Sequence, residues 1–445
     1  MGYRPRTPIP RRPPVAPTIV DGYMTRPAGE IGRSPNENRP GYKKTKVGWI
    51  PEGWGCVKGS EITSLIGKGA SPKWQGFNYV ATGMLFVTSE NVRDGYLDVS
   101  VPKFLPLTFH TKLKRTQLRR GDILINLVGA SIGRSCRVKQ DLGSANVNQA
   151  VAVFRVRDSH SVPFVEFFFQ APETVKRILD MQVDAARPNI SLTDLRDFQI
   201  PLPTLPEQHK ISEILSAWDN AIEKTAALLS QKRLAFNGYR IELLQKPNVG
   251  NSKKYRLSEI SSEITRRNDG SDVSAMMISS TRGFIDQSEK YGRDMTGESL
   301  QKYILLKKGE FAYNRGNSKT YPYGCIFRLE ANRALIPFVY TCFKLNKDVE
   351  PRYFRHYFEV GSLNRQLHPL ISSSARGNGL LNINDKYFFS CKVPVPDIAY
   401  QRKSADFLDR ALLEIRLLER RLEIYRLQKK GLMQKLLRGQ IRVKV

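Results

Sequence analysis

Cysteine and histidine are scarce in this sequence. Only 5 of its 445 residues are cysteines, and 5 are histidines. The cysteines are scattered without a Cys-x-x-Cys pair, and the histidines show no spacing typical of metal ligands. Such usage predicts reduced cysteines in a cytosolic protein, and no metal site.

Long apolar runs are also absent. None approaches the ~20 residues that a membrane span requires. The most apolar stretch, residues 163–169, is interrupted by Glu166. The N-terminus lacks the charged and then apolar order of a secretory signal. We therefore expect neither a membrane span nor a secretory leader.

Sequence signatures of catalysis are missing too. Neither Asp-x-Lys nor Glu-x-Lys occurs, so the carboxylate–lysine signature of many nucleases is absent. There is no Asn-Pro-Pro-aromatic methyltransferase motif and no Gly-x-x-x-x-Gly-Lys-Ser/Thr loop for ATP. The Gly-x-Gly pairs at Gly67 and Gly377 lack a third glycine and are typical of flexible turns. We expect no catalytic residue, metal or cofactor in this chain.

Acidic residues are far fewer than basic ones. The sequence has 71 Lys and Arg against 42 Asp and Glu, so its formal net charge is 71 − 42 = +29. Such an excess attracts polyanions, above all nucleic acid. The alternatives are a ribosomal or histone-like tail, a membrane surface, an acidic protein partner and simple solubility. Residues 1–46 are rich in proline and arginine and are predicted to form a disordered basic tail.

The sequence contains a long internal repeat. Residues 206–244 recur in outline at residues 399–437, with a constant shift and no gap. The segments before the two copies also correspond, since Ile200-Pro-Leu-Pro203 matches Val393-Pro-Val-Pro396. A gapless repeat of this length indicates duplication. The chain is therefore predicted to form two globular units, each followed by a long helix.

A heptad spacing runs through both copies of the repeat. Apolar residues at alternating steps of four and three are typical of a coiled-coil seam. The two helices are predicted to pair in antiparallel orientation, which would place the globules at opposite ends of a rigid rod, related by an approximate two-fold axis. The predicted seam residues are Ile211, Leu215, Trp218, Ile222, Leu229, Phe236, Leu408, Ile415, Leu418, Leu422, Tyr425 and Leu432.

These patterns predict an α+β fold. Residues 47–205 and 249–398 carry short strand signals bounded by glycine or polar turns, and we expect them to be globular domains. In the first of them a helix is predicted over residues 162–181. Residues 206–248 and 399–445 are the two predicted spacer helices.

Four short motifs occur in one order along the chain. They are Ile50-Pro-Glu-Gly-Trp54, Gly129-Ala-Ser-Ile-Gly133, Ile200-Pro-Leu-Pro203 followed by Pro206-Glu-Gln-His-Lys-Ile211, and Leu436-Leu-Arg-Gly-Gln-Ile-Arg442. Their order, combined with the duplicated architecture, resembles the specificity subunits of Type I restriction–modification systems. The second unit departs from the Pro-Glu-Gln pattern but keeps a glutamine at Gln401.

The resemblance implies a DNA-recognition subunit without catalysis of its own. The globular domains would be target-recognition domains, each binding one half of a split, asymmetric site in double-stranded DNA, with the paired helices as a ruler. The helices would dock two methyltransferase subunits, which carry S-adenosylmethionine, and through them nuclease/translocase subunits, which use ATP and Mg²⁺. The family acts in phage defence in the bacterial or archaeal cytoplasm, at the nucleoid. A stand-alone two-domain DNA-binding regulator is the alternative, and a protein scaffold is third.

Recognition of base edges requires hydrogen-bonding side chains on loops. For Ser131 the alternative is that it braces its own loop, and for Asn148 and Gln149 that they satisfy turn hydrogen bonds. Lys73 and Trp74 form either a stacking pair or a hydrophobic patch. The candidate DNA-binding residues are Ser131, Arg134, Asn148, Gln149, Arg187 and Asn189 in the first unit, and Arg315, Asn317, Lys319, Tyr321, Arg376 and Asn378 in the second.

Overall fold

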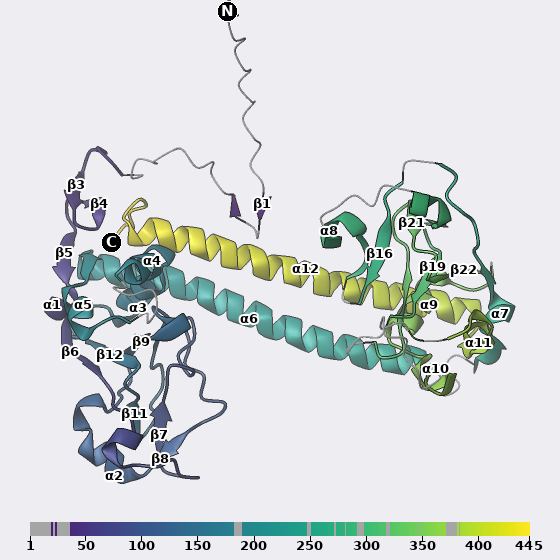
Figure 1. The fold of residues 1–445 in the computed structure, drawn as a ribbon. Coiled ribbons are helices and arrows are strands. Elements are labelled where there is room, and N and C mark those ends of the chain that lie inside the picture. Colours follow the sequence, from purple (N-terminus) through teal and green to yellow (C-terminus); the bar gives the residue numbers. More distant parts are fainter. Residues whose placement is uncertain are drawn as a thin grey trace, which may run out of the picture. The chain divides into compact units, whose positions relative to one another are not determined.

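The computed structural model of the chain describes residues 19–20, 23–24 and 36–445, apart from short internal segments. Those segments are 182–188, 247–250, 271–272, 281, 292–297, 317–320, 347, 371–380 and 382. The chain divides into two compact units. Unit 1 contains the residues up to 221 together with 425–445, and unit 2 contains residues 222–424. Figure 1 labels the helices and strands of each unit.

Unit 1 is built around a four-stranded antiparallel sheet with the strand order β10-β9-β12-β6. Strands β9 and β12 are almost entirely buried, which explains their near-continuous apolar sequences. Unit 1 also contains a smaller sheet, β11-β7-β8, and the antiparallel pair β13-β5. Their bounds are β5 (Gly55–Lys58), β6 (Thr63–Lys68), β7 (Met84–Val87), β8 (Phe104–Leu105), β9 (Ile123–Asn126), β10 (Ser135–Arg137), β11 (Ala145–Val147), β12 (Val151–Val156) and β13 (Gln199–Leu202).

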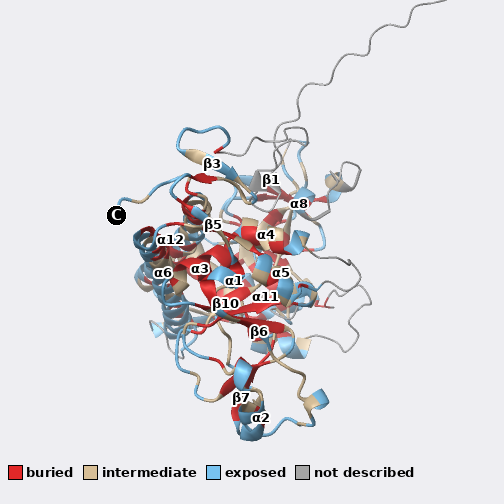
Figure 2. Ribbon diagram, turned by 90° about the vertical axis from the view of Figure 1, so that its left-hand side faces the viewer, coloured by how far each residue is buried: buried red, intermediate tan, exposed pale blue. Residues whose placement is uncertain are grey.

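The helix predicted over residues 162–181 is two helices. They are α3 (Val162–Gln170) and α4 (Pro172–Asp180). Pro172 lacks a backbone N–H and restricts Ala171 to an extended conformation, with φ −65° and ψ 133°, so one helix cannot continue through this point. The phenylalanines of α3 lie in the main core of unit 1, and Figure 2 colours this helix largely as buried. The other short helices of the unit are α1 (Gly59–Ile62), α2 (Leu107–Lys112) and α5 (Leu192–Asp197).

Unit 2 repeats the main sheet of unit 1 strand for strand. Its order is β20-β19-β22-β15. The register is also the same, since Ile123 faces Phe154 in unit 1 and Phe311 faces Phe343 in unit 2. The strands are β14 (Lys253–Arg256), β15 (Ser261–Glu263), β16 (Met276–Ser279), β17 (Gly283–Asp286), β18 (Ile304–Lys307), β19 (Phe311–Asn314), β20 (Cys325–Arg328), β21 (Arg333–Ile336), β22 (Thr341–Leu345) and β23 (Lys392–Val395). The short helices are α7 (Leu257–Ile260), α8 (Gln287–Tyr291), α9 (Pro351–Glu359), α10 (Asn364–Leu367) and α11 (Asp385–Ser390).

A buried glutamine has the same hydrogen bonds in each unit. In unit 1 the Gln208 side-chain oxygen accepts from the Ser161 backbone N–H (2.9 Å), and its nitrogen donates to the carbonyl of the proline five residues earlier (2.9 Å). In unit 2 Gln401 accepts from the Glu350 N–H (2.8 Å) and donates to the carbonyl of the proline five residues earlier (2.8 Å). Ser161 and Glu350 are the N-caps of α3 and α9. The glutamine therefore connects the start of a long helix to the start of a core helix in both units.

The repeated sequences form two helices of equal length. They are α6 (Leu205–Leu244) and α12 (Ile398–Leu437), each of 40 residues. In each unit, later residues of α6 face earlier residues of α12, so the two helices pack in antiparallel orientation. The predicted α+β fold with two long paired helices is confirmed. The contacts are Glu207–Arg442 and Trp218–Tyr425 in unit 1, and Lys232–Glu414 and Tyr239–Phe407 in unit 2.

The heptad residues lie on the facing sides of α6 and α12. Trp218, Ile222, Tyr425 and Leu432 are partly buried. No described helix, these two included, is apolar enough over a sufficient length to span a membrane. The fully buried heptad residues, each at most 8% exposed, are Ile211, Leu215, Leu229, Phe236, Leu408, Ile415, Leu418 and Leu422.

Residues 36–46 are ordered, which corrects the prediction of a disordered tail over this part of 1–46. Strand β3 (Tyr42–Thr45) pairs with β4 (Gly48–Pro51), which lies beyond the predicted tail. Asn36 is 2% exposed and donates to the carbonyls of Trp49 (3.3 Å) and Arg438 (3.2 Å). Order here depends on partners outside the segment, so its own composition could not reveal it. Apart from β1 (Ile19–Val20) and β2 (Tyr23–Met24), the rest of the predicted tail lies outside the described residues.

Candidate nucleic-acid interface

Candidate residues of unit 1 meet at one end of the β9–β12 pair. The Leu127 N–H donates to the Ala150 carbonyl (2.8 Å), which joins the end of β9 to the turn before β12. Val128 forms an isolated β-bridge with Asn189, and a short 3-10 helix follows at once, over Gly129–Ser131. Residues 128–134, 148–150 and 189 therefore form one edge, which we call the unit 1 edge. Arg187 lies outside the described residues.

Ser131 and Arg134 differ in how they are bonded. Ser131 Oγ accepts from Asn126 Nδ2 (3.1 Å), which also donates to the Ser89 carbonyl (2.9 Å). Ser131 therefore braces its own loop. The Arg134 side chain is half-buried, and it makes no hydrogen bond or ion pair with any residue that the structure describes. Its guanidinium is thus available to an anion from outside the protein.

Asn148 and Gln149 differ in the same way. Asn148 Oδ1 accepts from the Ala150 N–H (3.1 Å), as in an Asx-turn. Gln149 is exposed, and its amide has no hydrogen-bond partner within the described part of the chain. Gly69 supports this turn from below, since its N–H donates to the Asn148 carbonyl (3.2 Å). A Cβ at Gly69 would lie 1.6 Å from the Val147 carbonyl oxygen, so only glycine fits there.

Arg315 has in unit 2 the backbone position that Leu127 has in unit 1. The Leu127 carbonyl accepts from the Ile190 N–H, just before α5, and the Arg315 carbonyl accepts from the Leu381 N–H, just before α11, at 3.0 Å in each case. The Arg315 guanidinium donates to Thr341 Oγ1 (2.7 Å) and pairs with Asp385, and the side chain is only 23% exposed. Its donors are thus directed to partners inside unit 2. This geometry favours a positioning role for Arg315 over the direct DNA contact that the sequence predicts.

Tyr321 also faces the interior of unit 2. Its hydroxyl donates to the Glu359 carbonyl at the end of α9 (3.4 Å), and its ring packs edge-on against Phe327. Burial raises the pKa of Tyr321. The other candidates of unit 2 lie outside the described residues, and they are Asn317, Lys319, Arg376 and Asn378.

Three of the motifs that carry the family resemblance meet in unit 1. Gly439, with φ +64°, lies so close to strand β4 that a Cβ there would be 2.4 Å from Pro51 Cγ and 3.4 Å from the Trp54 ring. Arg442 pairs with Glu207 (2.6 Å), whose side chain is 4% exposed. Segments 50–54, 206–211 and 436–442 are therefore one packed assembly, although they come from distant parts of the sequence.

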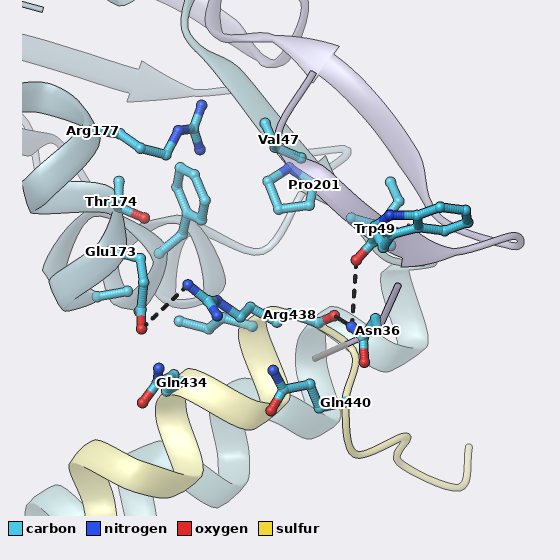
Figure 3. Close-up of a pocket in the computed structure, with 14 residues that line it drawn as sticks. Asn36, Val47, Trp49, Glu173, Thr174, Arg177, Pro201, Gln434, Arg438 and Gln440 are labelled. Atoms are coloured by element: carbon cyan, nitrogen blue, oxygen red, sulfur yellow. Dashed lines mark hydrogen bonds and ion pairs between the residues drawn. The ribbon is translucent and has the colours of Figure 1, made fainter. Parts of the chain in front are cut away.

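A cavity of about 320 Å³ lies beside this assembly, between β4, α4 and the end of α12 (Figure 3). Arg438 pairs with Glu173 (3.4 Å) in its wall. Arg177 lies over the Phe198 ring (4.4 Å), and burial lowers the pKa of its guanidinium. The charged groups of the wall thus contact one another or an aromatic ring. The lining residues include no nucleophile–base pair, which makes the cavity a packing junction.

Metal-binding and thiol chemistry find little support in the structure. Among the described residues, no three His, Cys, Asp or Glu side chains lie close enough to hold a metal ion. The five cysteines are free. Burial raises the pKa of Cys136, Cys325 and Cys342 to about 12, so these thiols are poor nucleophiles near neutral pH.

Comparison with known proteins agrees with this architecture. Residues 51–231 match the Type I restriction modification DNA specificity domain. The chain is 24% identical over 439 residues to the MjaX specificity subunit of Methanocaldococcus jannaschii, which covers 91% of this chain and 97% of that one. It is also 30% identical over 151 residues to the EcoBI specificity subunit of Escherichia coli, but this match covers only 33% of this chain and 31% of that subunit. Together these matches support a Type I specificity subunit.

Solved structures show the same fold. The crystal structure of a Type I restriction–modification system S subunit from M. genitalium superposes with a TM-score of 0.52 at 15% identity. The superposition covers 86% of this chain and 96% of that one. The chain therefore shares the fold of that S subunit.

A basic surface at the end of α2 was not among the predicted DNA-binding residues. Five cations lie within nine residues at the end of α2, all are exposed, and none forms an ion pair with a described residue. The Lys112 ammonium donates to the Gln75 carbonyl (3.4 Å), which places Trp74 near these cations. Trp74 is 89% exposed, and no aromatic ring among the described residues packs against it. The run of basic residues could have indicated this surface from the sequence. Its members are Lys112, Lys114, Arg115, Arg119 and Arg120.

Proposed function

We propose that this specificity subunit recognises a split, asymmetric site in double-stranded DNA, one half through each unit, and carries no catalytic group. The supporting observation is that the two units share strand order and register but present different side chains at equivalent edges. Arg134 and Gln149 at the unit 1 edge have no side-chain partner among the described residues, whereas unit 2 has an inward-facing Arg315 at the position of the buried Leu127. Two domains of one fold with different edges suit two different half-sites.

Charge supports binding to duplex DNA. The five cations at the end of α2 have no acidic partner among the described residues, so they can neutralise phosphates without breaking ion pairs. Phosphate contacts of this kind provide affinity and register, while side chains that reach base edges provide specificity. We assign the phosphate contacts to the α2 cluster and the recognition of bases to the unit 1 edge.

Helices α6 and α12 are proposed to set the spacing between the half-sites. Each has 40 residues, and a helix rises ~1.5 Å per residue, so each is ~60 Å long. In this proposal residues 47–205 and 249–398 are the target-recognition domains, and residues 206–248 and 399–445 are the spacers. Removal of one heptad from a spacer helix should change the number of free bases between the half-sites. An unchanged number would contradict the spacer role.

The outer faces of the long helices are proposed to dock two methyltransferase subunits, and through them nuclease/translocase subunits. Support comes from apolar side chains that the helix pairing leaves in solvent. Leu413 and Leu417 on α12 are 55% and 59% exposed, and Leu234 on α6 is 76% exposed. Exposed apolar positions on an already paired helix indicate a further protein contact. The methyltransferase partners would supply S-adenosylmethionine, and ATP and Mg²⁺ would belong to the nuclease/translocase subunits.

Methylation sequencing tests the proposal. DNA would be taken from a host that expresses this chain with its cognate methyltransferase subunit and sequenced by a single-molecule method. We expect a split, asymmetric motif methylated once on each strand. If a soluble complex forms but no motif is methylated, the proposal is contradicted, and a stand-alone DNA-binding protein becomes the better explanation.

A further inference from the structure

The turn that precedes the central strand of the main sheet is equivalent in the two units. In unit 1 it joins β11 to β12, and the Val151 N–H donates to the Asn148 carbonyl (3.3 Å). In unit 2 it joins β21 to β22, and the Tyr340 N–H donates to the Pro337 carbonyl (3.0 Å). Three residues separate β11 from β12 and four separate β21 from β22, but the strands that follow have the same register, since Phe154 faces Ile123 and Phe343 faces Phe311. Gln149 and Phe338 each lie five residues before these phenylalanines and directly after the residue whose carbonyl accepts the turn hydrogen bond, so Phe338 has the place of Gln149.

The residues at the tips of the two turns have different chemistry. Gln149 is an exposed amide in unit 1. The corresponding residue Phe338 is 55% exposed, and the next, Val339, is 40% exposed. Neither belongs to a hydrophobic core of unit 2, and within the described part of the chain no aromatic ring packs against Phe338. Unit 2 thus presents an unpartnered apolar pair where unit 1 presents a hydrogen-bonding side chain.

Buried and hydrogen-bonded residues on both sides of the unit 2 turn fix its conformation. Its neighbours Ile336 and Tyr340 are 0% and 8% exposed, which anchors both ends of the turn in the core. Pro337 restricts the backbone at its start. Arg315 bonds to Thr341, the first residue of β22, and to Asp385 at the start of α11. The apolar tip is therefore pre-organised, as a surface that contacts a ligand should be.

Base chemistry relates these side chains to DNA. In the major groove adenine offers N7 and N6, which an asparagine or glutamine amide can bond together, whereas thymine offers a C5-methyl group to apolar side chains such as phenylalanine. On the basis of the proposed function, we propose that Phe338 recognises a thymine by contact with its C5-methyl group in the half-site of unit 2, and that Gln149 recognises an adenine in the half-site of unit 1. One turn position would then make the two half-sites differ.

Modified bases test this assignment in the complex of this chain with its methyltransferase subunits. Once methylation sequencing has defined the site, each thymine would be replaced in turn by uracil, which lacks only the methyl group. Burial of one such group contributes ~0.8 kcal/mol, so we expect about fourfold weaker binding at one thymine of one half-site. Phe338→Ala should abolish this preference, and Phe338→Leu should retain it.

Gln149 provides the matched control. Replacement of adenine by 7-deazaadenine removes the N7 acceptor, and one lost hydrogen bond corresponds to about 2- to 12-fold weaker binding. That loss should occur in the other half-site and should disappear in Gln149→Ala. Toleration of uracil at every thymine, or effects of both variants on the same half-site, would overturn the inference. Loss of methyltransferase binding in Phe338→Ala with unchanged DNA preference would overturn it too, since the turn would then contact protein. Binding to no split site at all would instead refute the proposed function.

Discussion

Replacement of the buried glutamine that begins each long helix should destabilise one unit at a time. In Gln208→Ala both side-chain hydrogen bonds disappear, and the Ser161 N–H and the Pro203 carbonyl remain without partners. Gln208 is 1% exposed, so water cannot easily replace the amide. An unsatisfied buried group costs about 1–3 kcal/mol, and local relaxation limits the sum for two groups to about 2–4 kcal/mol of unfolding free energy. With a urea dependence of ~2 kcal/mol per molar, the midpoint should fall by about 1–2 M.

Tryptophan fluorescence can assign the loss to a unit, because Trp49, Trp54, Trp74 and Trp218 all lie in unit 1. Gln208→Ala should lower the fluorescence midpoint. Gln401→Ala should lower the transition seen by far-UV circular dichroism and leave the fluorescence midpoint in place. Gln140→Ala is the control within unit 1, since Gln140 is exposed and should change stability by less than about 0.5 kcal/mol. If Gln208→Ala behaves like Gln140→Ala, the reasoning is refuted.

Three further predictions concern unit 2. Leu408→Ala should cost about 2–5 kcal/mol because the side chain is fully buried in the helix seam, whereas Leu413→Ala, at an exposed site, should cost less than about 0.5 kcal/mol in urea unfolding. Burial lowers the pKa of His356 in the folded chain, whereas in the unfolded chain His356 has the ordinary histidine pKa of ~6.5. As the pH is lowered from 7.5 to 5.5 the unfolded chain therefore binds more protons, and the free energy of unfolding should decrease. His356→Gln should show a smaller fall, and an equal one would rule out His356 as the cause. Arg315→Ala leaves Asp385 without its cation and should lower the free energy of unfolding by about 1 kcal/mol. It should also make the sequence requirement less strict in one half-site of the methylated motif, and an equal effect on both half-sites would contradict a local role.

The fold was largely accessible from sequence because its strongest signals are local and periodic. The gapless repeat located both long helices, which begin at Leu205 and Ile398 with the same offset as their ends. Heptad spacing placed Leu215 and Leu408 in the seam because helix geometry brings every third and fourth residue to one face. The break at Pro172 follows from an equally local rule, which a simple reading of the apolar pattern over 162–181 overlooked.

The candidate interface was less accessible because exposure depends on pairing across the sheet. Arg315 next to a glycine looked like an exposed loop residue, yet strand register directs it to Thr341 and Asp385, the latter 70 residues away. No candidate residue was predicted between β21 and β22, where a turn exposes Phe338 and Val339. Only the strand register shows which residues of the two units correspond there.

The sequence by itself determined that this protein is duplicated, basic and equipped with two pairing helices, because charge and helical periodicity are properties of short stretches of chain. Its short motifs also indicated the family. Tertiary structure alone decided which polar residues are free. The side chains of Arg134 and Gln149 have no hydrogen-bond partner among the described residues, while Ser131 and Asn148 bond to their own loop, although all four lie at the same edge. The reason is physical: a polar side chain is available to DNA only if the folded loop leaves its hydrogen-bonding groups unsatisfied, and the loop conformation that decides this depends on the tertiary structure.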